Sequence, residues 1–199
     1  MKQSYHKKTL AKRLIRWACL LLLFGQVGRA QEMPVPLDLQ LQLFTKILTF
    51  DKNLEQRGGD TLRIAVIYQN LYLYSANTRE VFFSAADEMK LQWISGFPVR
   101  ILACDLRAAA ELREFILDHN IDIIYIAPLR AVPVDALTDI SRDLGVLSFT
   151  GVTDYMKHGV SVGLDIKDDR PKILVNQNNA RQEGTDFSSR LLHLAKIIN

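Results

Sequence analysis

Cysteine and long apolar runs are scarce in this sequence of 199 residues. It contains 2 cysteines, Cys19 and Cys104, and only Cys104 lies beyond residue 30, so residues 31–199 cannot form an intrachain disulfide. The apolar run from Trp17 to Phe24 is far shorter than the ~20 residues that a membrane-spanning helix needs, and no second long run follows it. The chain beyond residue 30 must therefore fold around a hydrophobic core without a disulfide, and we do not expect it to span a membrane.

Most of the chain carries no excess of positive charge. The first 30 residues hold 7 of the 25 Lys and Arg residues and none of the 22 Asp and Glu residues, which leaves residues 31–199 with a net charge of −4. Nucleic-acid and anionic-lipid surfaces require a concentrated basic patch. The composition therefore argues against a nucleic-acid partner.

Recognisable catalytic motifs are also missing. The sequence has no Gly-Lys-Ser/Thr phosphate loop, no nucleophile elbow and no His-Glu-x-x-His pattern. His119, His158 and His193 are isolated, without a second His or Cys at metal-ligand spacing. Asp168 and Asp169 stand in a predicted turn, where aspartate is favoured for local hydrogen bonding. We therefore expect a protein that is not an enzyme, with no catalytic residue, no metal site and no cofactor; a hydrolase is the least favoured alternative.

The first 30 residues have the organisation of an export signal. A basic stretch ends at Arg16, the apolar run follows it, and the small residues Gly28 and Ala30 precede Gln31. These three features are typical of a secretory signal peptide. The sequence predicts cleavage after Ala30, a periplasmic protein, and one domain over residues 31–199. An uncleaved N-terminal anchor is the alternative.

Helical and strand patterns alternate along the next 120 residues. Helical spacing of apolar residues predicts helices, and short runs rich in β-branched residues predict buried strands. The predicted helices cover residues 37–54, 75–91, 106–119 and 134–144, and the predicted strands cover residues 61–68, 99–104, 121–127 and 146–150. Strands separated by helices imply parallel βαβ units. The predicted fold is a single three-layer α/β domain, a mostly parallel sheet with helices on both faces.

The C-terminal part breaks this alternation. Residues 160–166 and 172–175 flank a charged turn and predict a β-hairpin, and residues 178–183 and 186–198 predict helices. In the last helix, one apolar stripe is formed by Phe187, Leu191, Leu194 and Ile198. We expect the sheet to cover this stripe; a partner surface is the alternative.

A ligand or partner site is expected at the carboxyl ends of the strands. Open α/β sheets bind ligands in the crevice there. The candidate residues are mostly polar and uncharged: Tyr68, Gln69, Asn70, Tyr72, Asp105, Thr150, Thr153 and Asp154. They suit hydrogen bonding to a small ligand or a partner backbone, although any such sheet has loops at this edge.

Two further residue environments can be assigned from the pattern. The segment 68–74 contains three tyrosines and two leucines, which is more apolar than a solvated loop needs. It either packs against the body of the fold or forms a partner surface. Cys104 ends an apolar run, so we expect a buried structural thiol.

The C-terminal half resembles a known family. The residues that carry the resemblance are Asp122–Ile126, Val146–Gly151, the hairpin end Ile173–Asn176, Asn179–Arg181, Gly184, and the block Phe187–Ala195 with its Ser-Ser-x-Leu-Leu-x-Leu-Ala ending. These stretches are similar to the YfiR/HmsC-like periplasmic proteins. The resemblance is clearest over residues 120–198 and looser over residues 36–119.

The resemblance implies a function that the residues alone do not. Members of this family are exported α/β proteins, and the best understood hold a membrane-bound diguanylate cyclase inactive and so restrain biofilm formation. A non-enzymatic periplasmic regulator that binds a membrane-bound cyclase or sensor kinase is therefore expected, and a homodimer is left open. Disulfide-bearing members use paired cysteines, whereas Cys104 has no partner in residues 31–199. The alternative function is a periplasmic small-ligand binding protein of a sensory or uptake system.

Overall fold

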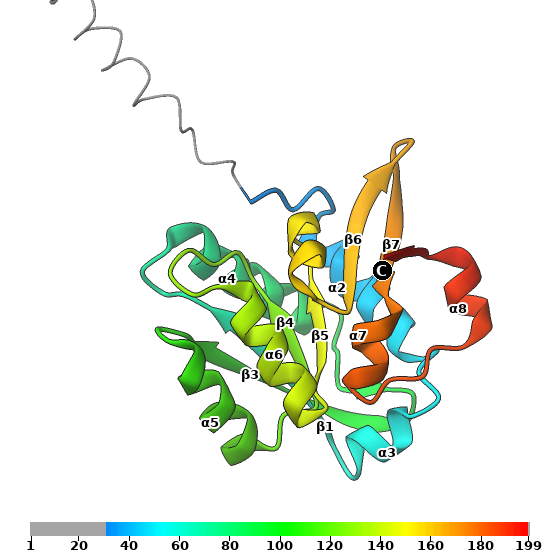
Figure 1. Cartoon of the computed structure of the whole chain (residues 1–199), viewed down its shortest axis with the longest axis horizontal. Coiled ribbons are helices and arrows are strands. Elements are labelled where there is room, and N and C mark those ends of the chain that lie inside the picture. The colour runs from blue at the N-terminus through cyan, green and yellow to red at the C-terminus, as the bar shows by residue number, and fades with distance from the viewer. Residues whose placement is uncertain (1–30, 199) are drawn as a thin grey trace, which may run out of the picture. The chain divides into compact units, whose positions relative to one another are not determined.

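The computed structural model describes residues 31–198, and the predicted signal peptide lies outside the described residues. Their sheet has the strand order β2-β3-β1-β4-β5-β6-β7-β8 (Figure 1). The strands are β1 Leu62–Tyr68, β2 Trp93–Ile94, β3 Phe97–Asp105, β4 Ile123–Ile126, β5 Leu147–Thr150, β6 Val162–Lys167, β7 Arg170–Asn176 and β8 Lys196–Ile198. The helices are α2 Leu37–Leu48, α3 Leu54–Gly58, α4 Leu73–Glu88, α5 Ala109–His119, α6 Val134–Leu144, the 3₁₀ helix η1 Thr153–His158, α7 Gln177–Gln182 and α8 Ser189–Leu194.

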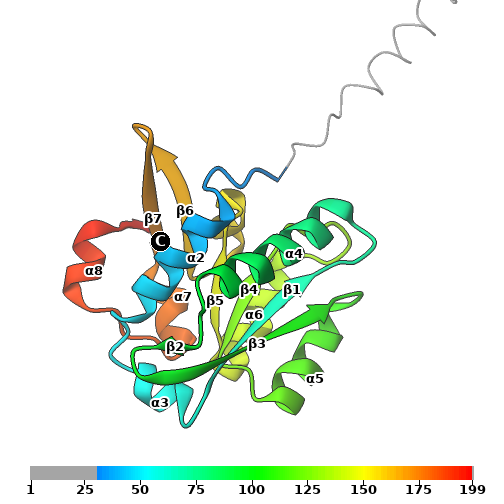
Figure 2. The same ribbon diagram turned by 180° about the vertical axis from the view of Figure 1, so that it is seen from behind.

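Helices cover both faces of this sheet. Helices α5 and α6 lie in front of the sheet in Figure 1, and α2 and α4 lie in front in the reverse view of Figure 2. Alternate residues of the central strand divide the core accordingly, because successive side chains of a strand point to opposite faces. Ile64 and Val66 pack in the cluster with α2 and α4, whereas Ala65 and Ile67 pack in the cluster with α5 and α6. The predicted three-layer α/β class is confirmed.

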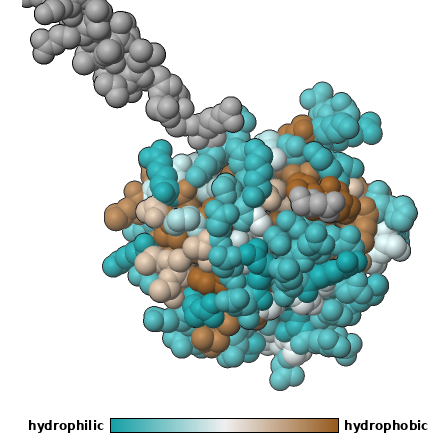
Figure 3. All heavy atoms as spheres, in the orientation of Figure 1, coloured by the Kyte–Doolittle hydropathy of each residue, from teal (hydrophilic) through white to brown (hydrophobic). Residues whose placement is uncertain are grey.

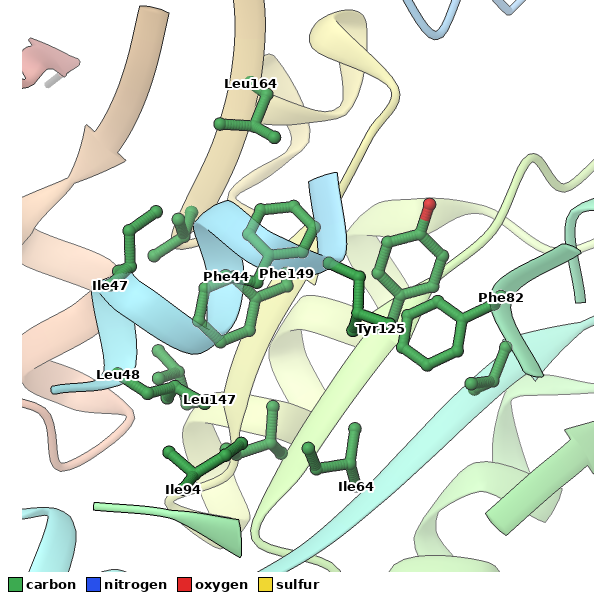
Figure 4. Close-up of a cluster of buried hydrophobic side chains, with 14 of the residues drawn as sticks. Phe44, Ile47, Leu48, Ile64, Phe82, Ile94, Tyr125, Leu147, Phe149 and Leu164 are labelled. Carbon is green, nitrogen blue, oxygen red and sulfur yellow. The ribbon is translucent and has the colours of Figure 1, made fainter. Parts of the chain in front are cut away.

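Aromatic rings fill the centre of the layer between the sheet and α2 with α4. Phe44 of α2 lies 4.7 Å from Phe149 of β5, centroid to centroid, and Phe82 of α4 lies 4.8 Å from Tyr125 of β4 (Figure 4). The Tyr125 hydroxyl does not remain unpaired in this apolar layer, because it donates to Gln40 Oε1 at 2.9 Å. Aromatic contacts of this kind make a large contribution to core stability.

The strand order positions the functional edge. Strands β3, β1, β4, β5 and β6 are mutually parallel, as successive pairs show. After β1 the chain enters α4 on one face, whereas after β3 and β4 it enters α5 and α6 on the other face. Loops that diverge to opposite faces open a crevice at the carboxyl ends of the strands between them.

The predicted first helix is too long at its C-terminal end. It stops at Leu48, and Leu54 starts the separate helix α3. Between them Asp51 Oδ1 accepts hydrogen bonds from the backbone N–H groups of Asn53 and Asp186. Aspartate bound to nearby backbone favours a turn over continued helix, and here it also ties the turn to the C-terminal segment.

The predicted helix over residues 186–198 is also wrong in its second half. Helix α8 ends at Leu194, and β8 pairs in parallel with β7, with Val175 opposite Ile197. The free edge of β7 offers backbone groups to be paired, and the β-branched pair Ile197 and Ile198 suits a strand. The expected apolar stripe is therefore divided: Phe187 and Leu191 are buried, whereas Leu194 is 58% exposed.

Candidate functional site

A cavity of about 490 Å³ lies at the carboxyl ends of β3, β1 and β4. Three loops line it, each following one of these strands: Gln69, Asn70, Leu71 and Tyr72; Asp105, Leu106 and Arg107; and Arg130 with Ala131. This is the point where the chain diverges to opposite faces of the sheet. The volume falls within the range of ~300–1,000 Å³ that is typical of small-molecule sites.

Half of the predicted site residues lie together in this cavity. Gln69, Asn70, Tyr72 and Asp105 line it. Tyr68 does not line it, because its ring lies half-buried, 5.5 Å from the guanidinium carbon of Arg79.

The remaining predicted residues, at and beyond the end of β5, lie outside the cavity lining, and the two threonines bind backbone groups. Thr150 is fully buried, and its hydroxyl donates to Ile126 O at 2.9 Å and accepts from Val152 N at 3.1 Å. The Thr153 hydroxyl donates to Leu164 O at 3.0 Å. The Asp154 carboxylate pairs with Lys157 at 2.5 Å. The structure thus brings the first half of the predicted edge together and gives the second half structural contacts.

Gln69 is the buried polar group of the cavity wall, with 7% of its surface exposed. Its Oε1 accepts hydrogen bonds from Arg130 N at 2.8 Å and Ala131 N at 3.3 Å. Both partners are donors, so the accepting atom must be the amide oxygen, and the side-chain NH₂ is the other branch. Within residues 31–198 that NH₂ has no hydrogen-bond acceptor, and it is not closed off from solvent.

Arg130 forms the cationic wall of the cavity. Its guanidinium carbon lies 4.3 Å from the centroid of the Tyr72 ring, a cation–π geometry. In the described part of the chain no carboxylate lies within 4.0 Å of the Arg130 or Arg107 guanidinium. Both cations therefore retain free N–H donors beside the cavity.

Tyr155 holds the loop that carries Arg130. Its hydroxyl accepts from Leu129 N at 2.7 Å and donates to Gln31 Oε1 at 2.9 Å, and Gln31 Nε2 donates back to Leu129 O. Burial raises the pKa of Tyr155 to about 12, so the hydroxyl stays neutral and keeps its proton for Gln31. A closed ring of hydrogen bonds thus fixes the backbone one residue before Arg130.

The loops after β1 and β3 are tied together as well. Asp105 Oδ1 accepts from Asn70 N at 2.8 Å, and Leu106 N donates to Tyr68 O at 2.7 Å. The site is therefore held by backbone contacts from three sides before any ligand binds. Such preorganisation lowers the entropic cost of binding.

Sequence reasoning missed Arg107 and Arg130, the two cations of the cavity. The predicted strands end at residues 104 and 127, and each arginine stands three residues further along the chain. Extending each predicted strand end by three residues would have included Arg107 and Arg130, since both follow a strand by a short loop.

Cys104 is the penultimate residue of β3, next to Asp105 of the cavity lining, and is 4% exposed. Burial, followed by the charges of Glu111 and Asp105, raises the pKa of its thiol to about 12. The thiol is therefore neutral and buried, as the apolar run indicated, and it offers no reactive thiolate to the cavity. Within residues 31–198 no cluster of three His, Cys, Asp or Glu side chains could hold a metal ion.

Exposed apolar residues extend from Leu71, in the cavity lining at its mouth, onto α4. Leu71 is 100% exposed, Leu73 is 73% exposed, and Tyr74 and Val81 of α4 are also exposed. A second group lies at the other end of the sheet and comprises Ile166, Leu194 and Ile197. Figure 3 shows a mostly hydrophilic face on which hydrophobic residues gather in separate patches, one of them over the β7–β8 end.

Most of this chain matches a known protein family. A family model described as YfiR/HmsC-like matches residues 42–196, more than half of the chain. The chain belongs to the YfiR/HmsC-like family. The match confirms the resemblance over both its clearer and its looser part, from the second half of α2 through β1 and the cavity to the start of β8. None of the curated proteins matches the sequence significantly.

Solved structures share the fold at low sequence identity. A conserved domain protein from Vibrio cholerae is 13% identical, with a TM-score of 0.55, and the match covers 82% of this chain and 60% of that one. An ABC domain in complex with L-Trp from Streptococcus pneumonia is 12% identical, with a TM-score of 0.53, and the match covers 78% of this chain and 61% of that one. The YfiR/HmsC-like chain thus spans about three fifths of the length of each of these structures.

The family, and not an activity or a partner, is what these comparisons show for this chain. In the described residues, no helix is both long enough and apolar enough to cross a membrane.

Proposed function

We propose that this protein is a non-enzymatic exported regulator that binds the periplasmic part of a membrane-bound diguanylate cyclase or sensor kinase and restrains it. The observation that carries the proposal is the family match over residues 42–196. The predicted signal peptide over residues 1–30, with cleavage after Ala30, supplies the route to the periplasm. The N-terminus of the exported protein, measured by mass spectrometry, should begin at Gln31.

The partner surface in this proposal is the apolar mouth of the cavity. Leu71 and Leu73 place large apolar side chains in solvent at the start of α4, beside the aromatic rings of Tyr72 and Tyr74. Apolar and aromatic side chains grouped on a surface favour a protein contact. The backbone beneath them is held by Gln69, Ser75 and Asp105, so the surface is rigid before it meets a partner.

Introduction of negative charge into the apolar mouth tests this surface. Leu71→Glu with Leu73→Glu should abolish recovery of the membrane partner in an envelope pull-down and release the repressed signalling output. Leu117→Glu is the matched control, because Leu117 is an equally apolar residue that is 58% exposed on α5. The melting temperature of each variant should stay within a few degrees of the wild-type value, since all three side chains project into solvent.

Two results of that experiment would contradict the proposal. Recovery of no membrane signalling protein by the wild-type chain would reject the regulator function itself. Loss of recovery by Leu194→Glu, with the Leu71 and Leu73 variant unaffected, would move the partner surface to the β7–β8 end.

A small-ligand binding protein of a sensory or uptake system is the second candidate. The cavity at the divergent strand ends favours it, and a fold neighbour is an ABC domain solved in complex with L-Trp. A thermal-shift screen discriminates the two functions, because a ligand present at ~100 times its dissociation constant adds ~2.7 kcal/mol of stability. A flat screen together with a positive pull-down would leave only the regulator.

A further inference from the structure

We propose that the cavity between the loops after β1, β3 and β4 binds a small monocarboxylate with an apolar body. This inference names the ligand class for the second proposed function and rests on that function. It depends on the groups that line the cavity and on which of their donors and acceptors are already used within the fold.

The charge of the cavity lining favours an anion. Arg107 and Arg130 contribute two positive charges, and Asp105 contributes one negative charge. One oxygen of Asp105 is already bound by Asn70 N, whereas neither guanidinium has a carboxylate partner among residues 31–198. The lining thus has a net charge of one positive unit, which a single carboxylate balances.

The geometry of Arg130 favours a carboxylate over a compact ion. The Tyr72 ring supports its guanidinium at 4.3 Å and limits the directions in which the N–H groups point. A planar guanidinium held in one orientation offers paired donors that match the two oxygens of a carboxylate.

The buried side chain of Gln69 supplies an independent pointer to a ligand. Its oxygen is fixed by two backbone N–H groups, so the side-chain NH₂ is also fixed in place, and it has no acceptor among the described residues. Gln69 is 7% exposed and solvent still reaches its NH₂, so this group is a fixed donor that an acceptor atom of a ligand can bind in place of water. A carboxylate oxygen between Gln69 and Arg130 is such an acceptor.

The remaining lining is apolar and defines the body of the ligand. Leu71, Leu106, Ala131 and the Tyr72 ring contribute hydrocarbon surface. Ligand sites commonly combine such surface with a few placed polar groups that fix orientation. A charged group alone would leave this apolar surface uncovered.

Four small probe molecules test the carboxylate of the ligand and its apolar body separately. Phenylacetate, phenylacetamide and phenethylamine share one apolar body and carry a negative charge, no charge and a positive charge at neutral pH; acetate carries the charge without the body. Each is titrated into the protein with residues 31–199, and binding is followed by ¹H–¹⁵N NMR. Phenylacetate should bind at least about tenfold more tightly than each of the other three and should shift the side-chain amide signals of Gln69.

Arg130→Gln provides the site-specific test. Because Arg130 is exposed and its side chain makes no hydrogen bond in the described fold, this variant should fold normally and weaken phenylacetate binding by at least about tenfold. Arg113→Gln is the control, since Arg113 lies on α5 and pairs with Asp143. It should leave binding unchanged.

Each other outcome overturns the inference in a distinct way. Equal binding of phenylacetamide or phenethylamine would reject the carboxylate, and equal binding of acetate would reject the apolar body. No binding of any probe up to about 10 mM would reject the ligand class, whereas the small-ligand function itself is judged by the separate thermal-shift screen. The partner pull-down is independent of these titrations and would still judge the regulator.

Discussion

Glu183 is a fully buried carboxyl group that no apolar pattern in the sequence marks. Its Oε1 accepts from Ser141 Oγ and Ser148 Oγ, both at 2.7 Å, and its Oε2 accepts from Ser148 N at 2.9 Å. Burial raises the pKa of Glu183 above its ordinary value, although the serine hydrogen bonds oppose this. The residue thereby joins α6, β5 and the segment after α7 through one side chain.

Replacement of Glu183 should give a stability change that depends on pH. A raised pKa means that the folded protein holds its proton more tightly than the unfolded chain, so this group contributes most stability below its unfolded pKa. That contribution is lost as pH rises through the folded pKa. The stability of the wild type relative to Glu183→Gln should therefore fall between about pH 4 and the raised folded pKa, measured by urea denaturation. A difference independent of pH would contradict the raised pKa.

Truncation at the same position should be far more damaging. Glu183→Ala leaves the N–H and the hydroxyl of Ser148 without their acceptor in a buried site, and the Ser141 hydroxyl keeps only Thr138 O. Each unpaired buried group costs about 1–3 kcal/mol, so the loss should be several times that of Glu183→Gln in the same denaturation series. Equal costs for the two variants would show that the hydrogen bonds contribute little.

The thiol of Cys104 should not react in the folded protein. Its pKa of about 12 leaves it protonated at pH 8, and 4% exposure blocks access by reagents. The protein comprising residues 31–199 should not react with a disulfide reagent until denaturant is added. One equivalent of the reagent should then react with the Cys104 thiol. Rapid labelling of the native protein would show that β3 opens locally at this edge.

At the scale of elements, the residues that start and stop a helix explain which predicted bounds were accurate. Helix α6 has the predicted bounds Val134–Leu144 because Pro133 precedes it and Gly145 adopts a φ of 69° after it, a conformation that glycine favours. The C-terminal helix was overestimated because β8 depends on an edge of β7 that lies about 20 residues earlier in the chain. Helical spacing carries no information on such a non-local pairing.

The candidate site was predictable to a similar extent. Parallel strands place their carboxyl ends at one edge, so Gln69, Asn70 and Asp105 could be grouped from strand order alone. The sequence could not show that Thr150 and Thr153 bind backbone instead of facing a cavity. That distinction depends on the path of η1, a 3₁₀ segment that has no strong sequence pattern.

The divided C-terminal stripe predicts opposite results for two leucines of α8. Leu191 is 1% exposed, so Leu191→Ala should cost about 2–5 kcal/mol and lower the melting temperature clearly. Leu194 is 58% exposed, so Leu194→Ala should change stability by less than about 0.5 kcal/mol. Calorimetry on both variants checks the pair; unchanged melting of Leu191→Ala with lost repression would make this stripe the partner surface instead.

At the scale of the whole molecule, Arg57 joins segments that lie far apart in the sequence. Its guanidinium donates to Gly145 O at 2.8 Å, Glu183 O at 2.6 Å and Thr185 Oγ1 at 2.8 Å, and also to Asp122 O. Its Nε lies 3.6 Å from Asp51 Oδ2, and the two side chains are 5% and 0% exposed. These contacts lie at the amino ends of β4 and β5, at the opposite edge of the sheet from the cavity.

Removal of the Arg57 charge should therefore destabilise the fold without touching the ligand site. Arg57→Met leaves Asp51 buried and unpaired, which should cost about 3–5 kcal/mol, a large share of the ~5–15 kcal/mol of a typical domain. Asp51→Asn keeps the acceptor for Asn53 N and Asp186 N but removes the charge. The double variant should thus be more stable than Arg57→Met alone in a denaturant series. Costs that simply add would show that the carbonyl contacts, and not the ion pair, make Arg57 necessary.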